Sequence, residues 1–124
     1  MNIILNNSSM KPIYEQIVDQ ISSQILDGTL LENTVLPSVR VLSSELRVSV
    51  LTVKKAYDAL EQSGLVVTVH GKGSYVAATG DNFREEEIRK KVESEFERVI
   101  QKGRSCGMTN DEMKELFEII LEEL

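Results

Sequence analysis

The sequence is poor in the residues that build covalent cross-links and metal sites. Its 124 residues include one cysteine, Cys106, and one histidine, His70. A single cysteine cannot form an intrachain disulfide, and this scarcity is typical of a reducing compartment such as the cytoplasm. One histidine without nearby cysteines or a carboxylate cluster is a poor metal site. We therefore expect neither a metal nor another cofactor.

Long apolar runs are also missing. No stretch stays apolar over the ~20 residues that a membrane-spanning helix needs. The first residues, Met1-Asn2-Ile3-Ile4-Leu5, have neither the basic region nor the long apolar core of a signal peptide. Together these absences predict a cytoplasmic protein without a membrane partner.

Combinations of residues that perform catalysis are scarce too. The sequence offers no Ser/His/Asp set and no Cys/His pair close together. The stretch Gly71-Lys72-Gly73-Ser74 has the composition of a phosphate-binding loop, but a Walker loop has Gly-x-x-x-x-Gly-Lys-Ser/Thr and opens a helix. Here the glycines are two positions apart and β-forming residues follow. We expect that the chain is not an enzyme.

Acidic residues exceed basic ones, but unevenly. The net charge is −6. Residues 1–78 hold 6 Lys/Arg and 7 Asp/Glu, whereas residues 79–124 hold 8 and 13. The first part is therefore close to neutral and can carry a local basic face, which the total charge hides.

Hydrophobic periodicity predicts three helices followed by a β-hairpin. The expected helices cover 12–27, 39–46 and 50–63, and the expected strands cover 65–69 and 74–78. Pro12 suits a first helical turn, Ser38 and Ser49 are expected N-caps, and Gly28 and Gly64 are expected helix ends. The positions expected to face inward on the second and third helices are Val41, Leu42, Leu46, Leu51, Val53, Ala56, Tyr57 and Leu60.

The C-terminal part predicts two further helices. A linker is expected over 79–82, a charged helix over 83–102, and a break from Gly103 to Gly107. Thr109-Asn110-Asp111-Glu112 is a capping box that opens the last helix. Both helices carry apolar stripes too large for a small monomer to cover, which favours a twofold dimer. The predicted dimerisation residues are Val92, Phe96, Val99, Ile100, Met113, Leu116, Phe117, Ile120 and Leu121.

The order of these elements predicts a mainly α fold with a small β-hairpin. Residues 1–78 form a winged helix-turn-helix domain and residues 83–124 a two-helix dimerisation segment. In a helix-turn-helix the recognition helix enters the DNA major groove with its N-terminal residues at the base edges. The glycines and lysine of the hairpin tip suit a close approach to the DNA backbone.

Five motifs strengthen this interpretation and resemble the DNA-binding domain of the GntR family of bacterial transcription regulators. They are Pro12-Ile13-Tyr14-Glu15-Gln16-Ile17, Leu36-Pro37-Ser38-Val39-Arg40, Val48-Ser49 with Thr52-Val53-Lys54-Lys55-Ala56-Tyr57, Leu60-Glu61 with Gly64, and His70-Gly71-Lys72-Gly73-Ser74-Tyr75-Val76. Together they span about residues 11–78. The short tail, with Gly107-Met108-Thr109-Asn110-Asp111-Glu112, resembles the YtrA-type subfamily.

The resemblance implies DNA contacts for nine residues: Ser38, Arg40, Ser49, Thr52, Lys54, Lys55, His70, Gly71 and Lys72. The chain departs from the family pattern at Val50, where arginine is common, and at Arg47, where glycine is common. Val50 can meet a thymine methyl but cannot make a bidentate contact to guanine. Arg47 and Lys55 are candidates to replace the missing charge.

Several residues keep a structural alternative. Arg40 alone could pair with Glu45, and Thr52 could only reinforce the cap at Ser49. Of the two adjacent lysines we expect Lys54, more than Lys55, to face the groove. Tyr57 and Tyr75 are expected to anchor the core and the hairpin. Cys106 is expected to have no role.

The function predicted from these features is a sequence-specific, homodimeric DNA-binding regulator, most simply a repressor of a pseudo-palindromic operator. The YtrA-type resemblance implies an ABC-transporter operon as a target. A small-molecule effector in the helical segment remains possible, with its identity unknown. The alternative is a winged-helix module that binds a protein and not DNA, which the overall negative charge favours slightly.

Overall fold

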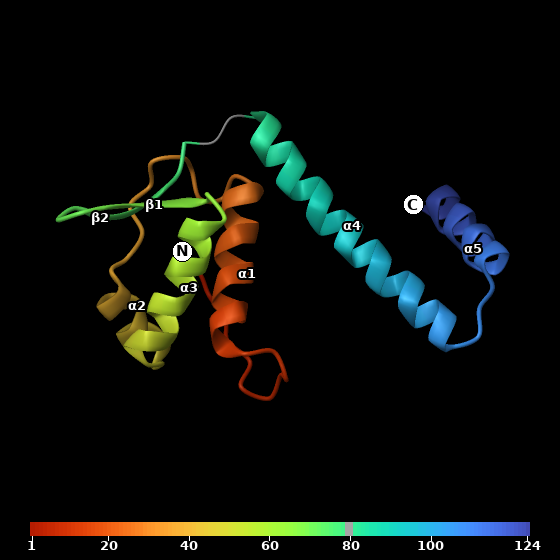
Figure 1. Ribbon diagram of the computed structural model, residues 1–124, viewed down its shortest axis with the longest axis horizontal. Coiled ribbons are helices and arrows are strands. Elements are labelled where there is room, and N and C mark those ends of the chain that lie inside the picture. Colours follow the sequence, from red (N-terminus) through yellow and green to blue (C-terminus); the bar gives the residue numbers. More distant parts are fainter. Residues whose placement is uncertain (79–80) are drawn as a thin grey trace. The chain divides into compact units, whose positions relative to one another are not determined.

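The structure is a computed structural model and describes residues 1–78 and 81–124. Within them it contains α1 (Ile13–Leu26), α2 (Val39–Leu46), α3 (Val50–Gln62), β1 (Val66–Val69), β2 (Gly73–Val76), α4 (Asp81–Ser105) and α5 (Asn110–Glu123). This order confirms the predicted mainly α fold with a small hairpin (Figure 1). The chain divides into two compact units, Met1–Arg84 and Glu85–Leu124.

The first unit is built around α1 and α3. Ile17, Ile21 and Ile25 repeat every four residues on α1 and are at most 1% exposed. They share one apolar cluster with Val53 and Leu60 of α3, both fully buried. The two helices lie side by side with their first turns at the same end of the unit (Figure 1). This arrangement leaves the start of α3 at the edge of the unit.

Two residues predicted to face inward are exposed instead. Val41 is 49% exposed and Leu51 is 77% exposed. Successive helical residues are rotated by about 100°, so Val41 lies on the opposite side of α2 from Leu46. Ser43 takes the inward place, where its hydroxyl donates to the carbonyl of Val48. Leu51 likewise lies opposite the buried stripe of α3 and belongs to the outer face of that helix.

An N-terminal segment, residues 2–6, lies along the side of α1 in an extended conformation. This segment was not predicted from the sequence. Gln20 binds both backbone groups of Ile4: its Oε1 accepts from the amide at 2.8 Å and its Nε2 donates to the carbonyl at 2.7 Å. Gln16 binds Asn6 in the same way, and Nε2 of Gln24 donates to the carbonyl of Asn2. Four helical residues rise about 6 Å and two extended residues about 6.6 Å. The glutamine ladder, Gln16, Gln20 and Gln24, therefore matches every second residue of the segment.

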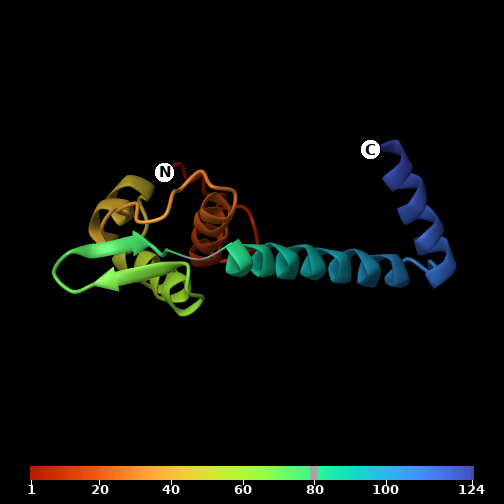
Figure 2. The ribbon, with the colours of Figure 1, turned by 90° about the horizontal axis from the view of Figure 1, so that it is seen from above.

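The hairpin is antiparallel, and a third segment supports it. Val66 pairs with Val76 and Val69 with Gly73. Val35, which the sequence places in a connector, forms a bridge with Tyr75 on the other side of β2. Backbone bonds from the Leu36 amide to the Ser74 carbonyl and from the Val76 amide to the Thr34 carbonyl, both 2.9 Å, hold this edge. In Figure 2 the tip of the hairpin points away from α1.

The second unit consists of α4 and α5, which are joined by a short turn. The rings of Phe96 and Phe117 meet edge to face with centroids 5.7 Å apart. The break predicted from Gly103 to Gly107 starts too early, because α4 continues to Ser105 and the chain leaves the helix only at Gly107, with φ +87°. Gly103 has a packing role instead: a Cβ there would lie 2.7 Å from Sδ of Met113. The predicted capping box is present, with Thr109 and Glu112 each accepting from the other's amide.

The predicted linker over 79–82 falls partly outside the described residues, at positions 79–80. Its other two residues are already helical, so α4 begins two residues before the predicted start at 83. Phe83 packs against the core of the first unit, where its ring lies beside Gly64. No helix of the described residues has the length and apolar character to cross a membrane.

Candidate nucleic-acid interface

The turn between α2 and α3 is fixed by two serine caps and one left-handed residue. Oγ of Ser38 accepts from the amide of Val41, and Oγ of Ser49 accepts from the amide of Thr52, both at 3.1 Å. Both caps confirm the predicted helix starts. Arg47 ends α2 with φ +56°, a conformation that favours glycine. The departure of this chain from glycine at position 47 therefore costs backbone strain.

A buried tyrosine joins the two helices of the motif. The hydroxyl of Tyr57 donates to the carbonyl of Pro37 at 2.6 Å, and the residue is 5% exposed. Burial, with a smaller contribution from the negative charge of Glu45, raises the pKa of Tyr57 to about 12. Tyr57 therefore stays neutral at physiological pH and acts as the expected core anchor.

The first turn of α3 presents both polar and apolar groups. The hydroxyls of Ser49 and Thr52 lie 2.7 Å apart and share a hydrogen bond. Val50 and Leu51 precede Thr52 and are 44% and 77% exposed. A helix N-terminus with unpaired backbone amides suits phosphate contact, and exposed apolar groups suit thymine methyls. Thr52 therefore reinforces the cap at Ser49, and its side chain is also partly exposed at the start of α3.

The two adjacent lysines of α3 have different partners in the free protein. Nζ of Lys54 lies 3.3 Å from Oδ2 and 3.4 Å from Oδ1 of Asp58, one turn further along the helix. Nζ of Lys55 lies 4.0 Å from the ring centroid of Tyr14 on α1, a cation–π contact. Lys55 therefore leans toward α1, and Lys54 stays on the outer face of α3.

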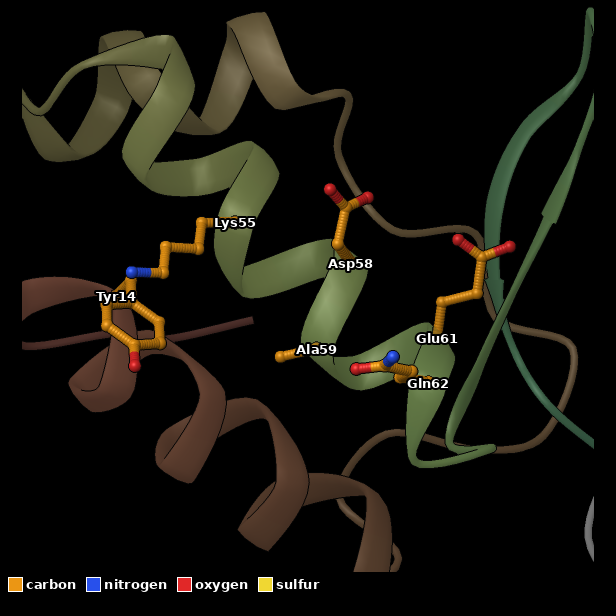
Figure 3. Close-up of a pocket in the computed structure, with 6 residues that line it drawn as sticks. All are labelled: Tyr14, Lys55, Asp58, Ala59, Glu61 and Gln62. Carbon is orange, nitrogen blue, oxygen red and sulfur yellow. The ribbon is translucent and has the colours of Figure 1, made fainter.

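Figure 3 shows the residues that line a shallow depression beside Lys55. It is lined by Tyr14, Lys55, Asp58, Ala59, Glu61 and Gln62. Lys55 reaches from α3 over the ring of Tyr14, while Asp58 and Glu61 project from the same helix (Figure 3). Asp58 offsets the charge of Lys54, and Glu61 adds a second carboxylate to the same helix, so the outer face of α3 is not strongly basic.

Arg40 is exposed on the first turn of α2. Among the described residues, the ion pairs do not include a bond between Arg40 and Glu45. The alternative in which Arg40 serves only as the partner of Glu45 therefore gains no support. Its guanidinium is available on the same helix-turn-helix as α3.

The hairpin tip is built to expose a lysine. The amide of Lys72 donates to the carbonyl of Val69 at 2.9 Å, and Gly71 has φ +78°, as at the third position of a type II turn. The hydroxyl of Tyr75 donates to the carbonyl of Lys72 at 3.3 Å. His70, Gly71 and Lys72 are all exposed, and Tyr75 fixes the tip as expected of a hairpin anchor.

Residues 13–76 match the family described as "Bacterial regulatory proteins, gntR family". The chain belongs to the GntR family. This match covers α1 to β2 and therefore the whole helix-turn-helix and its hairpin.

Curated relatives of this GntR protein match nearly its full length. The HTH-type transcriptional repressor YtrA of Bacillus subtilis is 31% identical over 97% of this chain and 90% of its own. The HTH-type transcriptional regulator YhcF of the same organism is 33% identical over 86% of this chain and 88% of its own. Because the YtrA match includes the tail, the chain is of the YtrA type.

Solved structures agree with this assignment. YtrA from Sulfolobus acidocaldarius, a GntR-family transcription factor, is 32% identical, covers 98% of both chains and has a TM-score of 0.59. A GntR-family regulator from Listeria monocytogenes is 29% identical, covers 92% of this chain and 97% of its own, and has a TM-score of 0.75. The DNA-binding domain of AraR, solved in complex with operator ORX1, is 31% identical over 62% of this chain and 96% of its own, with a TM-score of 0.55.

These comparisons confirm the predicted winged helix-turn-helix fold and the predicted class of function. The GntR protein described here is a DNA-binding transcription regulator and not an enzyme, because its family and relatives are regulators. The alternative of a winged helix that binds only protein is not favoured.

Proposed function

We propose that this GntR protein is a homodimeric repressor that reads a pseudo-palindromic operator. The observation that carries the proposal is that one helix-turn-helix unit exposes both the start of α3 and the tip of its hairpin. In the helix-turn-helix mode the first residues of α3 meet base edges, and the tip of the hairpin meets the backbone. Repression is supported by the repressor YtrA, which is similar over nearly the whole chain.

The residues proposed to contact DNA divide by chemistry. Lys54, Thr52 and Val50 lie on or near the first two turns of α3 and are proposed to face base edges. The residues proposed to contact phosphates are Ser38, Arg40, Ser49, Lys55, His70, Gly71 and Lys72. Phosphate contacts set the position on the duplex, and base contacts give the sequence preference.

Dimerisation is proposed to occur through α4 and α5, within residues 83–124. These helices leave large apolar side chains exposed: Phe96 and Phe117 are 47% and 45% exposed although their rings touch. A groove of about 830 Å³ lies between them, lined mainly by apolar side chains. An apolar surface of this kind favours burial against a twofold copy. The remaining proposed dimerisation residues are Val92, Val99, Ile100, Met113, Leu116, Ile120 and Leu121.

Dimerisation can be tested directly by sedimentation at micromolar concentration. The wild type is expected at twice the chain mass, and Phe117→Glu is expected as a monomer because it places a charge in the apolar groove. Glu118→Lys, a charge change at the next position, is the control and should remain dimeric. A wild-type monomer at this concentration would contradict the proposed dimer.

Three finer parts of the proposal follow from the family resemblance. The target is proposed to be an operon for an ABC transporter, and the protein is proposed to act in the cytoplasm, where bacterial operators lie. A small-molecule effector is proposed to enter the groove between α4 and α5, because this groove lies outside residues 1–78, which are proposed to form the DNA-binding domain. Loss of repression of a neighbouring transporter operon on deletion of the gene tests the target.

A further inference from the structure

The outer face of α3 carries a cation and an anion held together as one unit. Both oxygens of Asp58 lie within 3.4 Å of Nζ of Lys54, and the two side chains are 60% and 61% exposed. The lysine precedes the acid in the chain, which is the less favourable order for such a pair along a helix. Helix stability alone is therefore a weak reason for Asp58 to be there.

An acid is also costly on a helix that enters DNA. Asp58 projects from the outer face of α3 and lines the depression beside Lys55 (Figure 3). A carboxylate close to phosphates is repelled, and a lysine that leaves its partner for a phosphate leaves that carboxylate unpaired. Asp58 becomes favourable only where the DNA offers it a hydrogen-bond donor. In the major groove that donor is an amino group of cytosine or adenine.

The spacing of the pair matches the edge of a single base pair. Lys54 and Asp58 present a donor and an acceptor 3.3 Å apart. A Watson–Crick pair presents an acceptor and a donor on its major-groove edge, joined by their own hydrogen bond of about 2.9 Å. The two patterns are complementary, so the lysine and the carboxylate can bind one base pair without separating.

The neighbouring atoms of the base pair select G·C over A·T. In G·C the ammonium meets O6 and N7 of guanine, which are both acceptors, and the carboxylate meets N4 of cytosine. In A·T the carboxylate would lie beside N7 of adenine, another acceptor, and the ammonium beside the methyl group of thymine. In G·C both charged groups find hydrogen-bond partners. In A·T the carboxylate faces a second acceptor and the ammonium faces an apolar methyl group.

We propose that Lys54 and Asp58 read one G·C base pair in each half-site as a unit, with Lys54 on guanine and Asp58 on cytosine. This makes Asp58 a specificity-determining residue, and the inference rests on the proposed entry of α3 into the major groove. On other sequences Asp58 remains without a donor, and its charge lowers the affinity.

The test compares binding motifs selected from a random duplex pool by the wild type, Lys54→Ala, Asp58→Asn and Asp58→Ala. Glu61→Gln is the matched control, because it removes a carboxylate from the same helix without touching the pair. The wild type and Glu61→Gln should share one strongly preferred G·C position in each half-site. Both Asp58 variants and Lys54→Ala should reduce that preference roughly tenfold.

Each of the other outcomes overturns the inference in a distinguishable way. If Lys54→Ala loses the preference and the Asp58 variants keep it, Lys54 reads the base alone and the proposed function stands. If Glu61→Gln loses it as well, the effect is one of general charge. If the wild type selects no motif, the proposed function fails together with the inference. Circular dichroism confirms that each variant is folded.

Discussion

The phenol oxygen of Tyr57 lies 2.6 Å from the carbonyl oxygen of Pro37 and ties the recognition helix to the residue before the cap of α2. Removal of this hydroxyl in Tyr57→Phe keeps the ring in the core but leaves the carbonyl without its donor. We expect a loss of about 1 kcal/mol in the free energy of unfolding. Urea denaturation measures it, and an unchanged midpoint would show that water replaces the phenol.

The same side chain gives the stability a dependence on alkaline pH. The pKa of Tyr57 is raised from 10.0 to about 12 in the folded protein, so the unfolded chain loses this proton first. The contribution of neutral Tyr57 is therefore complete below pH 10 and is lost as the pH rises toward 12. Tyr57→Phe should show a smaller fall in stability across this window than the wild type, because lysines titrate in both. Equal slopes in the two proteins would contradict the assignment.

The left-handed residue Arg47 predicts opposite effects on stability and on binding. With φ +56° at the end of α2, a residue with a Cβ is strained where glycine is not. Arg47→Gly should be more stable than Arg47→Ala by about 1 kcal/mol. Both variants should weaken DNA binding equally if the guanidinium of Arg47 supplies, near the phosphates, the positive charge that Val50 lacks. A more stable Arg47→Ala would exclude backbone strain as the cause.

The glutamine ladder predicts local order in the N-terminal segment. Gln20→Ala removes both bonds to Ile4, and Gln24→Ala removes one bond to Asn2. We expect Gln20→Ala to lower stability by roughly 1 kcal/mol, with a smaller effect for the control Gln24→Ala. Amide hydrogen exchange at Ile4 should accelerate most in Gln20→Ala. Unchanged exchange there would mean that packing of Ile3 and Leu5 holds the segment.

The hairpin tip and the recognition helix should differ in their salt dependence. Lys72→Ala removes a proposed phosphate contact, so it should weaken binding to all sequences alike and lower the salt slope by about one per site. Lys54→Ala should weaken operator binding more than non-specific binding, by roughly 1–3 kcal/mol. Lys90→Ala on α4 is the control and should change neither. A sequence-selective loss at Lys72 would contradict this division.

Local patterns in the sequence predicted the first unit closely because caps and periodicity act over a few residues. Ser38, Ser49 and Gly64 fix helix ends wherever the helix packs, and the Gly71 turn fixes the hairpin. Periodicity does not place the positions beside the apolar stripe, and Leu51, predicted to face inward, lies on the outer face. For α3 that exposure is itself informative, because it adds an apolar group to the candidate interface.

Features that depend on distant partners were not predictable from spacing. The bridge of Val35 to Tyr75 and the bonds of Gln20 to Ile4 join residues far apart in the chain. Gly103 looks like a helix end in the sequence, and only the position of Met113 shows why α4 continues through it. The contact of Lys55 with Tyr14 likewise appears only when α1 and α3 are placed together.

The most direct test of a dimeric, sequence-specific DNA reader is selection from a random duplex pool at two salt concentrations. The account predicts enrichment of a pseudo-palindrome whose half-sites lie about 34 Å, or a multiple, apart. Its binding should weaken at the higher salt concentration. The absence of any enriched sequence, with retention that does not depend on salt, would contradict the account.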